Sequence, residues 1–112
     1  MPGNRLEKVN NLLRTEVAKI VHNEVELKTG ALITITRATV SPTLEHATIW
    51  ISVFPKEEEE DVLKRINAKI YFLQQILNKK LSMRPVPKIR FDFDRSEEKA
   101  SKLDEIFEKL AR

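Results

Sequence analysis

The sequence predicts an α+β fold, in which a three-stranded sheet has one face covered by helices. Three segments are rich in β-branched residues or alternate apolar and polar residues, as strands do, and they span residues 32–40, 47–54 and 88–93. Apolar residues recur at three- and four-residue steps before, between and after these segments, which is typical of amphipathic helices. The order helix, strand, strand, long helix or helix pair, strand, helix favours one layer of sheet with helices packed on it. At 112 residues the chain is long enough for a single domain, residues 1–112.

The first predicted helix spans about residues 5–23. Its apolar stripe has helical spacing and consists of Leu6, Val9, Leu13, Val17 and Ile20. At ~100° per residue, Arg5, Lys8 and Lys19 fall together on the wheel, away from that stripe. These three cations either form an ordinary solvated flank or extend a larger basic surface.

A hairpin is predicted next. The apolar phase of strand 32–40 changes along its length, so we expect a bulge or strong twist near Arg37. Residues 41–44 form the turn, because Ser and Pro suit its early positions. The strand over residues 47–54 alternates cleanly, and the side chains expected to face the core are Ala47, Ile49, Ile51 and Val53.

Trp50 belongs to the polar face of that second strand. A half-exposed Trp could stack on a base or dock a partner, and the alternative is that a helix or a neighbouring side chain covers it. The two His residues, His22 and His46, are expected to be surface or capping residues. With no Cys and no acidic residues at a coordinating spacing, the sequence predicts no metal site and no cofactor.

Residues 62–91 carry eight Lys or Arg and no Asp or Glu. The net charge of the whole chain is only +3, because acidic residues elsewhere offset these cations. The local concentration of positive charge favours binding to a polyanion such as nucleic acid. The acidic run over residues 57–61 precedes this basic stretch. It fits the first turn of a helix, where negative charge meets the positive end of the helix dipole.

The long helical segment that follows has one apolar stripe, formed by Val62, Leu63, Ile66, Ile70, Leu73, Leu77 and Leu81. Lys64, Arg65, Tyr71, Gln75 and Lys79 fall on the opposite side of the wheel. The phase of the stripe is unbroken from Leu63 to Leu81, which favours a straighter helix and leaves a helix pair possible.

Pro85 and Pro87 end the helical segment, because both lack an amide donor and push the preceding residue toward extended geometry. Residues 88–93 alternate as a strand. A last amphipathic helix is predicted over residues 96–110, capped near Asp94 or Ser96. Its apolar face consists of Ala100, Leu103, Ile106, Phe107 and Leu110.

The composition excludes several classes of protein. The absence of Cys rules out disulfides, thiolate ligands and a thiol nucleophile. The N-terminal residues have no apolar signal-peptide region, and nowhere do eighteen apolar residues run together, so we expect a cytoplasmic protein without a membrane span. No set of His and acidic residues has a spacing that would place an acid–base pair, so the sequence predicts no enzyme.

Two segments resemble the bacterial ribosome-binding factor A family. Residues 40–52, VSPTLEHATIWIS, are similar to its strand-turn-strand signature, with Trp50 where the family usually has Tyr. Residues 81–96, LSMRPVPKIRFDFDRS, resemble its L-x-x-R-x-x-P-x-L-x-F-x-x-D-x-S block. The resemblance extends from Arg5 to the last helix. It implies a KH-like type II fold and a factor that assists maturation of the small ribosomal subunit, contacts ribosomal RNA without catalysis and is associated with growth in the cold.

The family usually has an Ala-x-Gly kink between its two central helices, and this sequence has Lys69, Ile70 and Tyr71 there. The missing small residues and the unbroken apolar phase both favour a straighter helix. The resemblance also implies the partners, which are the small ribosomal subunit and its ribosomal RNA, bound by a monomer.

We expect the main RNA face to consist of Lys64, Arg65, Lys69, Lys79, Lys80 and Arg84, extended by Arg5, Lys8 and Lys19. Trp50 and Tyr71 are the candidate stacking residues. Lys88 and Arg90 are less favoured, because they share a strand face with Asp92. The alternative is a protein-interaction domain of an assembly complex, whose basic face serves solubility.

Overall fold

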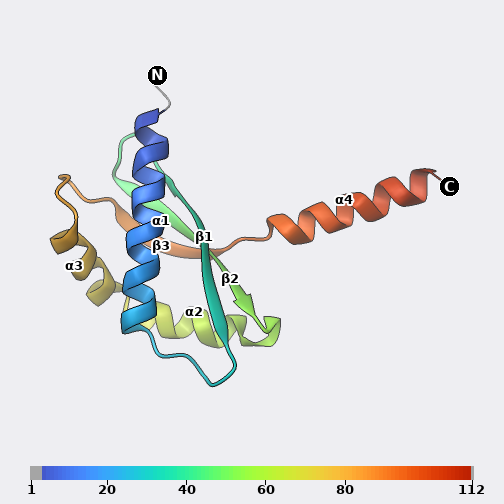
Figure 1. Ribbon diagram of the computed structural model, residues 1–112, viewed down its shortest axis with the longest axis horizontal. Coiled ribbons are helices and arrows are strands. Elements are labelled where there is room, and N and C mark those ends of the chain that lie inside the picture. Colours follow the sequence, from blue (N-terminus) through green and yellow to red (C-terminus); the bar gives the residue numbers. More distant parts are fainter. Residues whose placement is uncertain (1–3, 112) are drawn as a thin grey trace.

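The computed structural model describes residues 4–111, which form four α-helices, one short 3-10 helix and three strands (Figure 1). Residues 1–3 and 112 lie outside the described part of the chain. The elements are α1 (Asn4–Glu24), β1 (Leu32–Val40), β2 (His46–Phe54), η1 (Lys56–Glu58), α2 (Glu59–Ala68), α3 (Ile70–Lys80), β3 (Lys88–Phe93) and α4 (Ser96–Ala111). The predicted α+β class and element order are confirmed.

The sheet has the strand order β1-β2-β3 and mixed direction. β1 and β2 pair antiparallel, and their register shifts between Ile35 and Arg37, which confirms the predicted bulge. β2 and β3 pair parallel, with Ile49 opposite Phe91. A parallel pair needs a long crossover connection, and α2 and α3 provide it.

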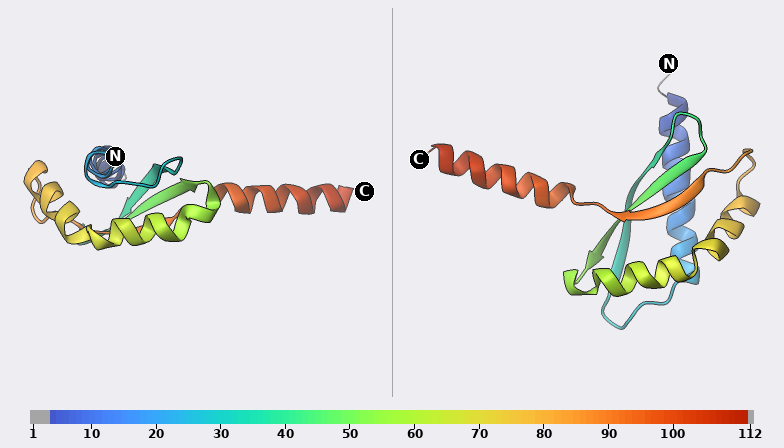
Figure 2. Two further views of the ribbon diagram at one scale, coloured as in Figure 1. Left: turned by 90° about the horizontal axis from the view of Figure 1, so that it is seen from below. Right: turned by 180° about the vertical axis from the view of Figure 1, so that it is seen from behind.

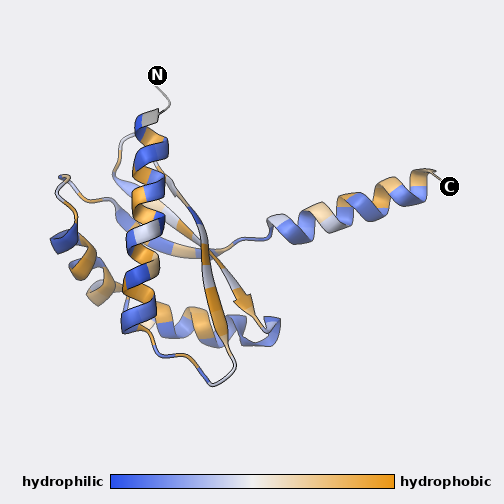
Figure 3. Ribbon diagram, viewed as in Figure 1, coloured by the Kyte–Doolittle hydropathy of each residue, from blue (hydrophilic) through white to orange (hydrophobic). Residues whose placement is uncertain are grey.

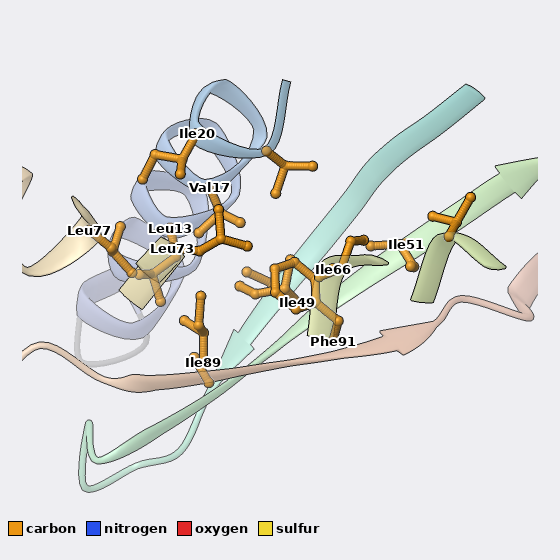
Figure 4. Packing of buried hydrophobic residues seen from close by; sticks show 14 of the residues in the cluster. Leu13, Val17, Ile20, Ile49, Ile51, Ile66, Leu73, Leu77, Ile89 and Phe91 are labelled. Carbon is orange, nitrogen blue, oxygen red and sulfur yellow. The ribbon is translucent and has the colours of Figure 1, made fainter. Parts of the chain in front are cut away.

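The core lies between one face of the sheet and the three helices α1, α2 and α3 (Figure 4). The predicted inward face of β2 is confirmed, since Ala47, Ile49, Ile51 and Val53 are all buried. The helices contribute buried side chains from three directions, among them Leu13, Val17 and Ile20 from α1, Val62 and Ile66 from α2, and Leu73 and Leu77 from α3. The opposite face of the sheet carries no helix and is polar over most of its length.

The chain bends at Lys69, between α2 and α3, so the central segment is a helix pair and not the straighter helix that its unbroken apolar phase favours (Figure 2). Lys69 leaves helical geometry with φ −110° and ψ 6°, a negative φ that any L residue adopts, so the bend needs no glycine. Its ammonium donates to the Glu24 carbonyl at 2.7 Å, which ties the bend to the end of α1. The apolar phase continues across the bend because both helices bury the same side against one core.

The last helix, α4, extends away from the rest of the molecule (Figures 1 and 2). Its observed span agrees with the predicted residues 96–110, and it is amphipathic as expected. None of its residues is buried. The helical layer on the sheet is therefore made by α1, α2 and α3, and α4 takes no part in it.

Candidate nucleic-acid interface

All nine cations of the predicted RNA face belong to the helices, to the bend between α2 and α3 or to the loop after α3. Three lie on α1 (Arg5, Lys8 and Lys19), two on α2 (Lys64 and Arg65), one at the bend (Lys69), two at the end of α3 (Lys79 and Lys80) and one in the following loop (Arg84). Arg65 is half-buried and the other eight are exposed. The structure thus places these cations on the side of the molecule away from the open sheet face.

Two of these cations meet where α1 and α3 lie side by side. The ammonium groups of Lys19 and Lys80 lie 3.7 Å and 4.0 Å from the two carboxylate oxygens of Glu16. Both lysine side chains are largely exposed, so the ion pairs contribute little to stability. One carboxylate between two lysines leaves a net positive charge at this junction, and Lys79 is the next residue along α3.

Two other predicted cations make internal contacts. Arg65 donates through Nε to Asp61 at 2.8 Å and through an amino nitrogen to the Glu26 carbonyl at 3.0 Å. Lys69 donates to the Glu24 carbonyl. These contacts hold α2 and the bend against the segment that follows α1, so both side chains have a positioning role.

Arg84 is partly engaged and Lys79 is not. One amino nitrogen of Arg84 donates to the Leu81 carbonyl at 2.7 Å and to the Met83 carbonyl at 2.6 Å, and a guanidinium has further donors that can face a ligand. Within residues 4–111, no carboxylate lies within 4.0 Å of the Lys64 or Lys79 ammonium.

Trp50 lies on the open face of the sheet and is covered by a neighbouring side chain. The Arg37 guanidinium carbon is 4.4 Å from the centre of the Trp50 ring, and Trp50 Nε1 donates to the Thr39 hydroxyl at 3.0 Å. Arg37 belongs to no site predicted from the sequence, because its place opposite Trp50 depends on the register after the bulge. The other stacking candidate, Tyr71, is 77% exposed on α3. The two aromatic residues therefore lie on different sides of the molecule.

A charged network connects the start of α4 to the sheet and to α2. Asp94 accepts hydrogen bonds from the Thr36 hydroxyl at 2.7 Å, the Ser96 amide at 2.9 Å and Arg37 Nε at 3.3 Å. These bonds, led by those from Ser96, hold the pKa of Asp94 far below its ordinary value of 3.8. The predicted cap near Asp94 or Ser96 is confirmed, with the Asp94 carboxylate accepting from the first amide of the helix.

Arg95 completes this network. Its two amino nitrogens donate to the Glu59 carboxylate at 2.9 Å and 3.2 Å, and this bidentate contact raises the pKa of Arg95. The Lys56 ammonium lies 3.0 Å from the Glu98 carboxylate, and this hydrogen bond lowers the pKa of Glu98. The first turn of α4 is thereby joined to η1 and α2 by side chains.

Two kinds of site do not occur in the described part of the chain. No group of three His, Asp or Glu side chains in it could hold a metal ion. None of the described helices combines the length and the apolar character needed to cross a membrane.

The chain resembles known proteins over nearly its whole length. A family model for ribosome-binding factor A matches residues 5–107. Ribosome-binding factor A of Clostridium botulinum (strain Eklund 17B / Type B) is 29% identical over 113 residues, which cover 98% of this chain and 97% of that protein.

Two solved structures share the fold. The crystal structure of ribosome-binding factor A from Thermus thermophilus has a TM-score of 0.66 at 18% identity, over 79% of this chain and 93% of that one. A Thermus thermophilus RbfA homology model, fitted into a cryo-electron microscopy map of a 30S–RbfA complex, has a TM-score of 0.64 at 19% identity. It matches 77% of this chain and 91% of that one. At these identities the two structures show the fold alone.

Proposed function

This chain belongs to the ribosome-binding factor A family, and from this membership we propose that it assists maturation of the small ribosomal subunit by binding its ribosomal RNA. The 30S–RbfA complex of the Thermus thermophilus relative supports the small subunit as the binding partner. The whole chain, residues 1–112, acts as a single KH-like RNA-binding domain, in the cytoplasm and as a monomer. It acts by binding and catalyses no reaction.

The exposed cations on the helical side support this proposal most directly. Phosphate contacts from Lys and Arg release counterions, and the affinity then falls steeply with salt, by about 0.7 to 0.9 in log–log slope per phosphate neutralised. Such contacts position a protein on RNA without determining sequence preference. Specificity in this mode comes from the shape of the folded RNA.

The contacts within the protein divide the predicted residues by role. We assign the phosphate contacts to the cations at the α1–α3 junction and along both helices, which are Arg5, Lys8, Lys19, Lys79 and Lys80, together with Lys64 and Arg84. Arg65 and Lys69 instead hold the bend in place through their bonds to Asp61, Glu26 and Glu24. Tyr71 stacks on a base from the same side, being largely exposed.

Charge reversal at Lys79 and Lys80 tests the proposed RNA face. The double variant Lys79→Glu/Lys80→Glu should bind purified small ribosomal subunits at least tenfold more weakly, and the salt dependence of its binding should be less steep. The matched control is Lys88→Glu/Arg90→Glu, which makes the same charge change on the open face of the sheet, outside the proposed face. Unchanged binding of the Lys79/Lys80 variant, or an equal loss in the control, would remove this face from the proposal.

The maturation role has its own test. Crosslinking to mature and immature small subunits, with the crosslinked nucleotides mapped, should show a preference for immature particles. Absence of subunit binding would end the proposal.

A protein-interaction domain is the second candidate, and the uncovered apolar face of α4 favours it. In that case binding would survive in high salt and would not require RNA. Titrating salt from low to high concentration in the same binding assay distinguishes the two functions, because only phosphate contacts release counterions.

A further inference from the structure

The apolar face of α4 lies in solvent along the whole helix. Leu103 and Ile106 are each 53% exposed, Phe107 is 64% exposed and Leu110 is 76% exposed. At ~100° per residue these side chains and Ala100 share an arc of about 120°. Figure 3 shows apolar and polar residues alternating along α4 in the helical repeat. We call this arc the α4 stripe.

A helix of this kind is ordinarily stabilised by packing of its apolar face. α4 has 16 residues, close to the ~12–15 residues below which isolated helices are marginal in water, and the domain covers none of its stripe. The spacing of Leu103, Phe107 and Leu110 is that of the anchors an amphipathic helix inserts into a groove. The free energy that most helices gain by packing within their own chain is therefore available to α4 only from another molecule.

The domain holds the stripe away from its own surface. The bidentate contact between Arg95 and Glu59 and the ion pair between Lys56 and Glu98 join the first turn of α4 to α2 and η1. Asp94 fixes the residues just before the helix to β1. Because these contacts hold the start of α4 against α2, η1 and β1, the helix projects from the molecule instead of folding back onto the open sheet face (Figure 1).

The charges beside the stripe indicate the chemistry of the partner. Glu97, Asp104 and Glu108 follow one edge of the stripe at helical spacing, and Lys99, Lys102 and Lys109 lie at the other edge. A helix flanked by both signs of charge fits a protein groove whose two rims carry opposite charges, with the basic rim on the carboxylate side, whereas RNA presents only phosphate charge.

The size of the stripe argues against a second copy of this chain. A stable interface buries on the order of 1,600 Å² in total and involves roughly 20–30 residues a side, whereas the stripe offers five side chains. A preformed groove contacts the helix from both flanks, so it buries more of each stripe side chain than a second α4 helix would.

We propose that α4 docks as a single helix into an apolar groove on a protein of the small ribosomal subunit, with basic side chains along the rim that meets Glu97, Asp104 and Glu108. This inference rests on the proposed function and deepens it. The RNA face on α1 and α3 provides the phosphate contacts, and the α4 stripe provides a protein contact at a separate place on the same particle.

Two double variants of the full chain test the docking. Leu103→Gln/Phe107→Gln removes two anchors, and Gln is a good helix former, so α4 is retained. The matched control, Glu105→Gln/Lys109→Gln, places two glutamines on the polar side and leaves the net charge unchanged. Each is titrated against purified small ribosomal subunits and, separately, against protein-free small-subunit RNA.

The stripe variant should bind small subunits about tenfold or more weakly than the wild type, because central apolar anchors dominate such interfaces. Its affinity for protein-free RNA should stay within about twofold of the wild-type value, and the control should match the wild type on both probes.

Three results would overturn the docking proposal. They are equal binding of the stripe variant and the wild type to subunits, an equal loss on protein-free RNA, and a wild-type dimer in analytical ultracentrifugation that the stripe variant abolishes. If the wild type bound neither small subunits nor protein-free RNA, the proposed function itself would be overturned. Failure of the docking proposal and failure of the proposed function are therefore distinguishable.

Discussion

The first and last helices of this protein have the same kind of sequence and opposite surroundings. In α1 the stripe residues Leu13, Val17 and Ile20 are at most 2% exposed, because α3 and the sheet cover them. In α4, Leu103 and Phe107 are more than half exposed. The periodic pattern predicted both helices, and in neither case did it indicate what would cover the apolar side.

The difference shows that an amphipathic pattern predicts which side of a helix is apolar but not which element or molecule packs against that side. α1 is followed by the β1–β2 hairpin, whose inner face is apolar, so a surface that can cover the apolar side of α1 lies nearby in the chain. α4 follows β3, and the Asp94 and Arg95 contacts direct it outward. The same burial energy thus stabilises the fold at one end of the chain and is available for binding at the other.

The contrast predicts its largest effect on stability at Leu13. Leu13→Ala should lower the free energy of unfolding by about 2–5 kcal/mol, because it leaves a cavity in the core. Leu103→Ala should change it by less than about 0.5 kcal/mol, since the side chain is already in water. Urea unfolding followed by circular dichroism measures both, and similar losses would show that α4 is covered in solution.

Substitutions at Asp94, just before α4, and at Asp104, within α4, should have different effects on the free energy of unfolding. Asp94→Ala removes a cap and should lower the free energy of unfolding by about 1 kcal/mol at neutral pH. The pKa of Asp94 is lowered in the fold, so the wild-type advantage is full above its ordinary value of 3.8 and is lost as the pH falls through the lower folded pKa. Urea unfolding at several pH values checks this. The exposed Asp104, changed to Ala, should show no such pH dependence.

Lys69 and Lys64 are two exposed cations on the same segment, of which only Lys69 is bonded to α1. Lys69→Met keeps the aliphatic stem and removes the bond to the Glu24 carbonyl, which should lower the free energy of unfolding by about 1 kcal/mol. Lys64→Met should have an effect within about 0.5 kcal/mol. If thermal unfolding shows the two variants to be equally stable, the Lys69 bond does not hold the bend.

The smallest effect is expected at Arg37, which covers part of the only Trp. Arg37→Ala removes the exposed cation–π contact and the weakest of the Asp94 bonds, so it should lower the free energy of unfolding by about 0.5 kcal/mol. It should also shift Trp50 fluorescence to longer wavelength. Arg90 lies on the same open face and bonds to Thr48, so Arg90→Ala is the control and should leave the emission unchanged. An unshifted spectrum in the Arg37 variant would mean that Trp50 is not covered by this side chain.

Local patterns predicted the strands well. The alternation of β2 and β3 gave their bounds to within a residue and, in β2, identified the inward side chains Ala47, Ile49 and Ile51. The bulge near Arg37 followed from a change of phase within one strand. These features depend on residues close together in the chain, so they can be inferred from it.

Long-range contacts were the features that the patterns missed. The bend at Lys69 has no glycine to mark it, and it is held by the Glu24 carbonyl, 45 residues away in sequence. The candidate RNA residues were identified by charge alone. Their division into free and internally bonded cations became visible only once Arg65 met Asp61 and Glu26 in space.

The sequence alone defines the elements, their order and their apolar faces, because periodicity and turn chemistry act over a few residues. It also concentrated eight cations and no acids in residues 62–91. The bend of the central helix, the cover of Arg37 over Trp50 and the exposure of the α4 stripe became visible only in the folded chain. Each of these depends on groups brought together from distant parts of the chain, where contact energies and geometry outweigh local preference.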